Sequence, residues 1–176
     1  MIKFMFEHIE ILFLLLLVVI STLLPHPANV TPIGALGLFA GTYIRQRGFL
    51  FLPVAAALLA DLSTVGVYSI LMMFFVYTGH FLSAFCGKYL VRNRSIATHL
   101  PVGVVAASLC FYLVSNLGNW WVYMPHTWNG FVENYINGLP YLLRTLIGNT
   151  IYGALFFGSF IALKQLLSRG EAFAGS

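Results

Sequence analysis

An apolar run over residues 67–90 constrains this chain more than any other feature of its sequence. The run contains one formal charge, Lys88, and it exceeds the ~20 residues that an α-helix needs to cross the hydrocarbon core of a bilayer. Charged residues make up 8% of the 176-residue chain, whereas a typical soluble domain has about 25%. So few charges cannot cover the surface of a water-soluble core. The sequence therefore predicts an all-α integral membrane protein.

Five further apolar segments predict about six transmembrane helices in all. They cover residues 11–24, 32–44, 49–60, 100–117 and 139–167. A cleavable signal peptide is rejected for the first segment, because the residues before it are not clearly positive and no A-x-A pattern follows it. Neither an internal repeat nor a low-complexity linker divides the chain, so we expect one transmembrane domain over residues 1–176.

Two of these segments are short for a complete crossing. Residues 32–44 and 49–60 are joined only by residues 45–48, so they form either two full spans or one re-entrant hairpin, and the sequence leaves both open. Thr31 followed by Pro32 predicts a helix N-cap with proline at the first helical position.

Lysine and arginine fall unevenly on the two faces that six crossings define. Eight of the nine lie on the face that the two termini share, and only Arg144 lies on the other. Because cytoplasmic loops of membrane proteins collect Lys and Arg, this asymmetry predicts that both termini are cytoplasmic. The basic residues are scattered rather than arranged in a stripe, which argues against nucleic-acid binding.

Small residues recur at intervals of four along the predicted helices. They are Gly37 and Gly41, Ala56 and Ala60, Gly103 and Ala107, and the triad Ala154, Gly158 and Ala162. This spacing lets helix backbones approach closely in lipid, where packing must drive association. The commoner interpretation is packing within the chain, and the alternative is that at least one set docks a partner subunit.

Two opposite charges stand near the external ends of predicted helices. Asp61 ends the third segment and Arg144 begins the sixth. A charge at membrane depth is costly unless it has a partner or a function. We therefore expect these two side chains to form an ion pair, which is either structural or part of a binding site.

Polar and aromatic residues gather on the same external side, chiefly in the expected connections 25–31 and 116–138. They are His26, Asn29, Asn116, Asn119, Trp120, Trp121, His126, Trp128, Asn129, Glu133 and Asn149. An interfacial aromatic belt is one interpretation of the tryptophans. The one-sided crowding with amides and charges indicates instead a concave ligand site. On the fourth segment Tyr77 and His80 share a helix face, where a lone histidine is typically a hydrogen-bonded packing residue.

Motifs for catalysis or metal binding are missing from the sequence. The five histidines are scattered without HxxxH spacing, and Cys86 and Cys110 lie in apolar runs without a CxxC pattern. There is also no P-loop and no G-x-S-x-G elbow. We therefore expect neither a cofactor nor enzymatic activity, and any active transport must take its energy from another protein or from an ion gradient.

Residues 25–41, with the sequence PHPANVTPIGALGLFAG, resemble the opening signature of a bacterial family of six-helix membrane proteins. Asp61-Leu62, Val76-Tyr77 and residues 115–121 and 149–152 resemble its later landmarks. More distantly, the size, the six helices and the cytoplasmic N-terminus are similar to the S components of energy-coupling factor (ECF) transporters, which capture vitamins or metal ions. This resemblance implies a location in the bacterial cytoplasmic (inner) membrane.

The S-component resemblance implies a substrate-binding subunit that captures a small vitamin-type molecule from the external face. Cobalamin is the named candidate, although the external cysteine that ligates cobalt in that subgroup has no counterpart here, so Met72, Met73 or His26 would have to replace it. The implied partners are an ECF-type coupling subunit and its ATPases. The expected substrate-binding residues are His26, Asn29, Asp61, Tyr77, Asn116, Trp120, Arg144 and Asn149.

Two other functions stay open at the level of sequence. One is an intramembrane enzyme that uses the external residues His26, His126, Asp61 or Glu133. The other is a membrane scaffold or assembly subunit, for which the polar groups of the external face would be dispensable.

Overall fold

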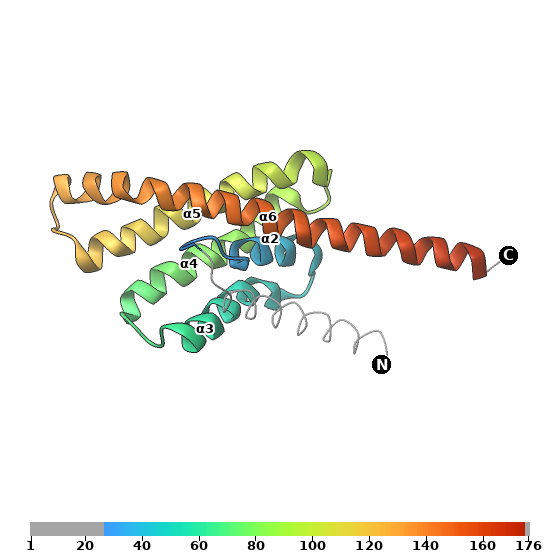
Figure 1. Ribbon diagram of the computed structural model, residues 1–176, viewed down its shortest axis with the longest axis horizontal. Coiled ribbons are helices and arrows are strands. Elements are labelled where there is room, and N and C mark those ends of the chain that lie inside the picture. The colour runs from blue at the N-terminus through green and yellow to red at the C-terminus, as the bar shows by residue number, and fades with distance from the viewer. Residues whose placement is uncertain (1–26, 175–176) are drawn as a thin grey trace.

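The computed structural model describes residues 27–174, which form a bundle of α-helices (Figure 1). The elements in chain order are α2 (Ile33–Tyr43), the 3₁₀ turn η1 (Arg47–Phe51), α3 (Leu52–Thr64), α4 (Ile70–Cys86), the π-turn η2 (Gly87–Val91), α5 (Ile96–Tyr123) and α6 (Trp128–Ala174). This part of the chain contains no strand, which agrees with the expected all-α class. The first predicted segment, residues 11–24, lies outside the described residues.

Three helical stretches are long and apolar enough to cross a membrane. They are Ile70–Val91, Ile96–Tyr123 and Trp128–Leu166. The helices α2 and α3 have 11 and 13 residues, so at 1.5 Å per residue they extend over roughly 16 and 20 Å. Neither alone reaches across ~30 Å of hydrocarbon. By length and composition, three helices of the described part could therefore each cross a membrane, which indicates a helical membrane protein, and six crossings stay a prediction.

The connection expected over residues 116–138 is wrong, because most of this stretch is helical. Helix α5 continues to Tyr123 and α6 begins at Trp128, where Thr127 accepts a hydrogen bond of 3.1 Å from the backbone N–H of Gly130. The polar composition of this stretch suggested a loop, but the side chains of Asn119 and Asn134 form hydrogen bonds between the two helices. Such tertiary pairing overrides the weak intrinsic preference of asparagine against helix.

The start of α2 also differs from the expected cap. The helix begins at Ile33, Pro32 is the N-cap, and no side chain caps the helix. The carbonyl of Pro32 accepts the first helical hydrogen bond from Leu36 at 2.8 Å. Thr31 therefore makes no cap, and its side chain lines a cavity instead.

Helix α2 lies inside the bundle, and every residue from Ile33 to Thr42 is buried. Its glycines allow this position. A Cβ atom on Gly37 would overlap the Ser83 hydroxyl, and one on Gly41 would overlap the carbonyl oxygen of Ala84, both on α4. The backbones of α2 and α4 are therefore in direct contact, as small residues four apart permit.

The other small-residue sets divide between the interior and the surface. Ala56, Ala60 and Ala107 are buried in the hydrophobic core, and Gly103 is buried against Val91. The triad on α6 is exposed, and a Cβ atom on Gly158 would meet nothing within 4 Å in the described structure. Packing within the chain thus explains the first three sets.

Arg92 binds the carboxyl-terminal end of α2. Its Nε donates to the carbonyl oxygen of Gly41 at 2.8 Å, and a terminal nitrogen donates to that of Ile44 at 2.5 Å. The last carbonyls of a helix lack partners within the helix, so a cation there satisfies them and interacts favourably with the helix dipole. This contact joins α2 to the connection between η2 and α5.

The close contact of α2 and α4 makes a direct prediction. Gly41→Ala should lower the free energy of unfolding by about 1–3 kcal/mol, because the new methyl group meets main-chain atoms that cannot move aside. Gly158→Ala is the matched control and should leave stability unchanged or slightly higher, since alanine is favoured over glycine in a helix by up to about 1 kcal/mol. Reversible unfolding in detergent measures both. Equal stability of the two variants would contradict the packing described here.

Candidate ligand-binding site

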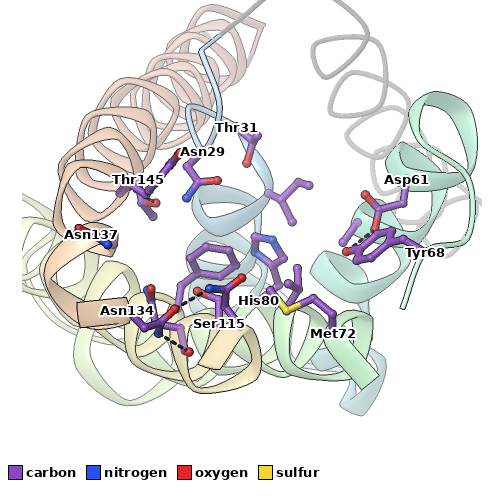
Figure 2. A pocket seen from close by; sticks show the side chains of 18 of the residues that line it. Asn29, Thr31, Asp61, Tyr68, Met72, His80, Ser115, Asn134, Asn137 and Thr145 are labelled. Atoms are coloured by element: carbon purple, nitrogen blue, oxygen red, sulfur yellow. Dashed lines mark hydrogen bonds between the residues drawn. The ribbon is translucent and has the colours of Figure 1, made fainter. Parts of the chain in front are cut away.

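A cavity of about 550 Å³ lies among the loop before α2, helices α3 and α4, and the pair formed by α5 and α6 (Figure 2). Small-molecule sites typically enclose about 300–1,000 Å³, so the volume suits a ligand. Its polar lining residues are Asn29, Thr31, Asp61, Tyr68, His80, Ser115, Asn116, Asn119, Asn134, Asn137, Tyr141 and Thr145. Its other lining residues are Ile33, Ala57, Met72, Val76, Phe111, Met124 and Gly138.

One wall of the cavity carries a carboxylate held by two tyrosines. The hydroxyls of Tyr77 and Tyr68 donate to Oδ2 of Asp61 at 2.9 and 3.3 Å. Burial, the charge of Asp61 and the hydrogen bond to Asp61 together raise the pKa of Tyr68 to about 12. Tyr68 therefore stays protonated at neutral pH and keeps donating its hydrogen bond to the carboxylate.

The expected ion pair between Asp61 and Arg144 does not form in the structure. Arg144 is exposed on α6, with its guanidinium carbon 5.3 Å from the centroid of the Tyr141 ring, and it does not line the cavity. The predicted ion pair fails for a physical reason. The hydroxyls of Tyr68 and Tyr77 donate to Asp61 the hydrogen bonds that were expected from the guanidinium of Arg144. A cation–π contact with an aromatic ring occupies Arg144 instead.

The opposite wall is a hydrogen-bonded group of amides between α5 and α6. The side-chain NH₂ of Asn119 donates to Oδ1 of Asn134, and that of Asn134 donates to the carbonyl oxygen of Asn116 at 2.8 Å. Gly138 leaves the space that the Asn116 amide occupies, since a Cβ atom there would overlap it. The amides thus hold the two helices together while they line the cavity.

Sequence reasoning missed most of the α6 wall, although a signal was present. Asn134, Asn137, Tyr141 and Thr145 are separated by three, four and four residues, the spacing of one helix face. The periodicity crosses the boundary between the expected connection 116–138 and the segment 139–167, so the sequence prediction does not place these four residues on one helix.

His80, a residue of α4, lies between the two walls (Figure 2). Its ring centroid is 4.5 Å from that of Phe111, with an angle of 34° between the planes. Its Nδ1 is buried and has no hydrogen-bond partner in the described structure. The expectation of a hydrogen-bonded packing residue is therefore not met. A buried polar atom without a partner costs about 1–3 kcal/mol.

The loop before α2 closes one side of the cavity. Asn29 has a φ of 67°, a left-handed conformation that asparagine tolerates better than most residues. It lies within a turn that is closed by a hydrogen bond of 3.0 Å from the N–H of Val30 to the carbonyl oxygen of Pro27. Gly148 of α6 admits the loop, because a Cβ atom there would lie 3.1 Å from Cα of Val30. The loop is thereby held against α6 with Asn29 and Thr31 facing the cavity.

The eight predicted site residues thus have different places in the structure. Asn29, Asp61 and Asn116 line the cavity, and Tyr77 binds Asp61. Arg144 stays outside, as described above, and His26 lies outside the described residues.

The remaining two of the eight make contacts that support the fold. Trp120 donates to the carbonyl oxygen of Pro125 at 3.1 Å and so stabilises the turn between α5 and α6. Asn149 is buried, and its NH₂ group donates to the hydroxyl of Ser108 at 2.9 Å, beside Gly34 of α2. Neither residue lines the cavity.

The residues of the cavity do not form a metal site. Within residues 27–174, no group of three or more His, Cys, Asp or Glu side chains could hold a metal ion. The lining groups that cobalt accepts are the sulfurs of Met72 and Met124 and the imidazole of His80.

Helices of membrane-spanning length around a polar cavity define the class as a helical membrane protein with an internal candidate ligand site. The chain belongs to the family of unknown function DUF6580, which it matches over residues 3–170. No curated protein and no solved structure matches it.

The hydrogen bonds of Asp61 predict which substitutions are energetically coupled. Asp61→Ala and Tyr77→Phe should show a coupling of about 0.5–3 kcal/mol, because the two side chains share a hydrogen bond. Asp61→Ala and Arg144→Ala should be additive within about 0.5 kcal/mol, because they share no partner. Free energies of unfolding of the single and double variants give both values. A coupling above about 1 kcal/mol between Asp61 and Arg144 would show that the pair exists after all.

Proposed function

We propose that the chain is a substrate-binding membrane subunit that captures a small polar molecule in the cavity between α3–α4 and α5–α6. The observation that carries this proposal is the lining of a cavity of about 550 Å³, in which Asp61 on one wall and Asn137 and Thr145 on the other present polar groups. A protein interior normally pairs its polar groups with one another or lines an empty space with apolar side chains. A bound molecule with hydrogen-bonding groups would complete this site.

The charge distribution supports capture from the external side. The carboxyl-terminal end of α3 and the amino-terminal end of α4 meet at the cavity, whereas Arg45, Arg92 and Arg94 lie at the other ends of the helices. Basic residues mark the cytoplasmic side of a membrane protein. The cavity then belongs to the external half of the molecule.

The resemblance to S components supports a function in uptake. Such a subunit needs an energy source, and the sequence carries no P-loop of its own. An ECF-type coupling subunit with its ATPases would provide it. The exposed apolar side chains of α4, α5 and α6 suit a lipid environment.

The size of the cavity favours a ligand smaller than cobalamin. A volume of about 550 Å³ falls within the range of sites for drug-sized molecules, which a corrinoid exceeds. A compact vitamin-type molecule is therefore the preferred substrate class, and a corrinoid is the alternative that the following experiment distinguishes.

Native mass spectrometry of gently purified protein tests the proposal. The wild-type chain should retain a small molecule. Ser115→Phe should lose it, because the ring fills the cavity that Ser115 lines. Ser159→Phe is the matched control, since Ser159 is exposed on α6, and it should retain the molecule. Failure of the wild-type chain to bind any molecule, or retention by the Ser115→Phe variant, would contradict the proposal. Uptake in a host without ECF coupling subunits would contradict the assignment of its partners.

A further inference from the structure

The described residues that line the cavity carry an unbalanced charge. Asp61 is the one carboxylate among the lining residues, and no lysine or arginine lines the described cavity. Arg144 is turned to the exposed face of α6 and forms no ion pair with Asp61. A partly buried carboxylate without a counter-charge is costly at the edge of a membrane.

The hydrogen bonds of Asp61 leave one of its oxygens available. Tyr68 and Tyr77 both donate to Oδ2. Oδ1 has no hydrogen-bond partner among the described residues, and neither tyrosine adds a positive charge. The two tyrosines thus fix the orientation of the carboxylate, while its charge and its second oxygen remain open to a ligand.

The other polar groups of the cavity face this carboxylate from a distance. Figure 2 shows Asp61 and Tyr68 on one side, Asn137 and Thr145 on the opposite side, and His80 between them. The opposite wall offers amides and hydroxyls, which are neutral donors and acceptors. A molecule that spans the cavity would therefore meet a negative charge at one end and neutral hydrogen-bonding groups at the other.

From this arrangement we infer that the ligand is an organic cation, with an ammonium group on Asp61 and an aromatic, hydrogen-bonding body that extends past His80 to the amides of α6. This inference rests on the proposed function and names its substrate class. Phe111 and the His80 ring supply an aromatic surface for the body of the ligand.

Two other ligand classes fit the cavity less well. A bare metal ion would leave most of the volume of about 550 Å³ empty, and the described residues offer no group of three ligands for it. A carboxylate or phosphate would place its negative charge beside Asp61, and none of the described lining residues is a lysine or arginine that could pair with it.

Three probes with one skeleton test the inference. Tryptamine, tryptophol and indole-3-propionate carry an ammonium, a hydroxyl and a carboxylate on the same indole-ethyl group. Each is added at millimolar concentration to the purified full-length protein, and its affinity is measured by thermal shift and by calorimetry. Tryptamine should bind at least about tenfold more tightly than the other two, because a hydrogen bond between charged groups is stronger than a neutral one.

Two variants locate the site of binding. Asp61→Asn keeps an acceptor for Tyr68 and Tyr77 but removes the charge. It should therefore lower the affinity for tryptamine at least about tenfold and leave the affinity for tryptophol unchanged. Glu133→Gln removes an exposed carboxylate of α6 that does not line the cavity, and it should bind tryptamine as the wild-type chain does. The melting temperature of each variant without probe reports whether it folds.

The outcomes separate this inference from the proposed function. Absence of tryptamine binding, equal affinity for the three probes, or unchanged affinity in folded Asp61→Asn would overturn the organic-cation class. Retention of a neutral or anionic molecule by the wild-type chain in native mass spectrometry would also overturn the organic-cation class. The proposed function as a substrate-binding subunit would still hold in that case.

Discussion

The contact between the backbones of α2 and α4 is the constraint on which the rest of the structure depends. Gly37 and Gly41 admit α4 so closely that a methyl group at either position would overlap it. Helix α2 has 11 residues and is too short to cross the hydrocarbon core by itself, so its position in the bundle depends on this contact. Its burial fixes the loop that precedes it, and that loop places Asn29 and Thr31 at the cavity.

The polar groups on the two walls of the cavity find their hydrogen-bond partners separately. On one side the tyrosines hold Asp61, and on the other the asparagines of α5 and α6 hold one another. The hydrogen bonds of each group do not involve the other group. His80 lies between them, and its buried Nδ1 has no hydrogen-bond partner among the described residues.

The sequence predicted the class of the protein and the approximate positions of its helices, because long apolar runs and few charges have one physical solution in lipid. It also grouped Asp61 with Asn116, and both residues line the cavity. It failed for Arg144 and for residues 116–138, since a charge rule cannot tell a cation–π contact from an ion pair, and isolated asparagines do not reveal partners on another helix. The sequence could not predict that Nδ1 of His80 lacks a hydrogen-bond partner among the described residues, because this depends on the three-dimensional arrangement.

The most direct test of the central claim, a polar cavity open to the external side, is the reactivity of a cysteine placed in it. Ser115→Cys, with Cys86 and Cys110 replaced by alanine, is treated in intact cells with a membrane-impermeant maleimide. The thiol should react, because it meets water in the cavity and can ionise. Ser159→Cys on the exposed face of α6 should stay unlabelled in lipid. Equal labelling of the two positions, or labelling of Ser115→Cys only after lysis, would contradict the account.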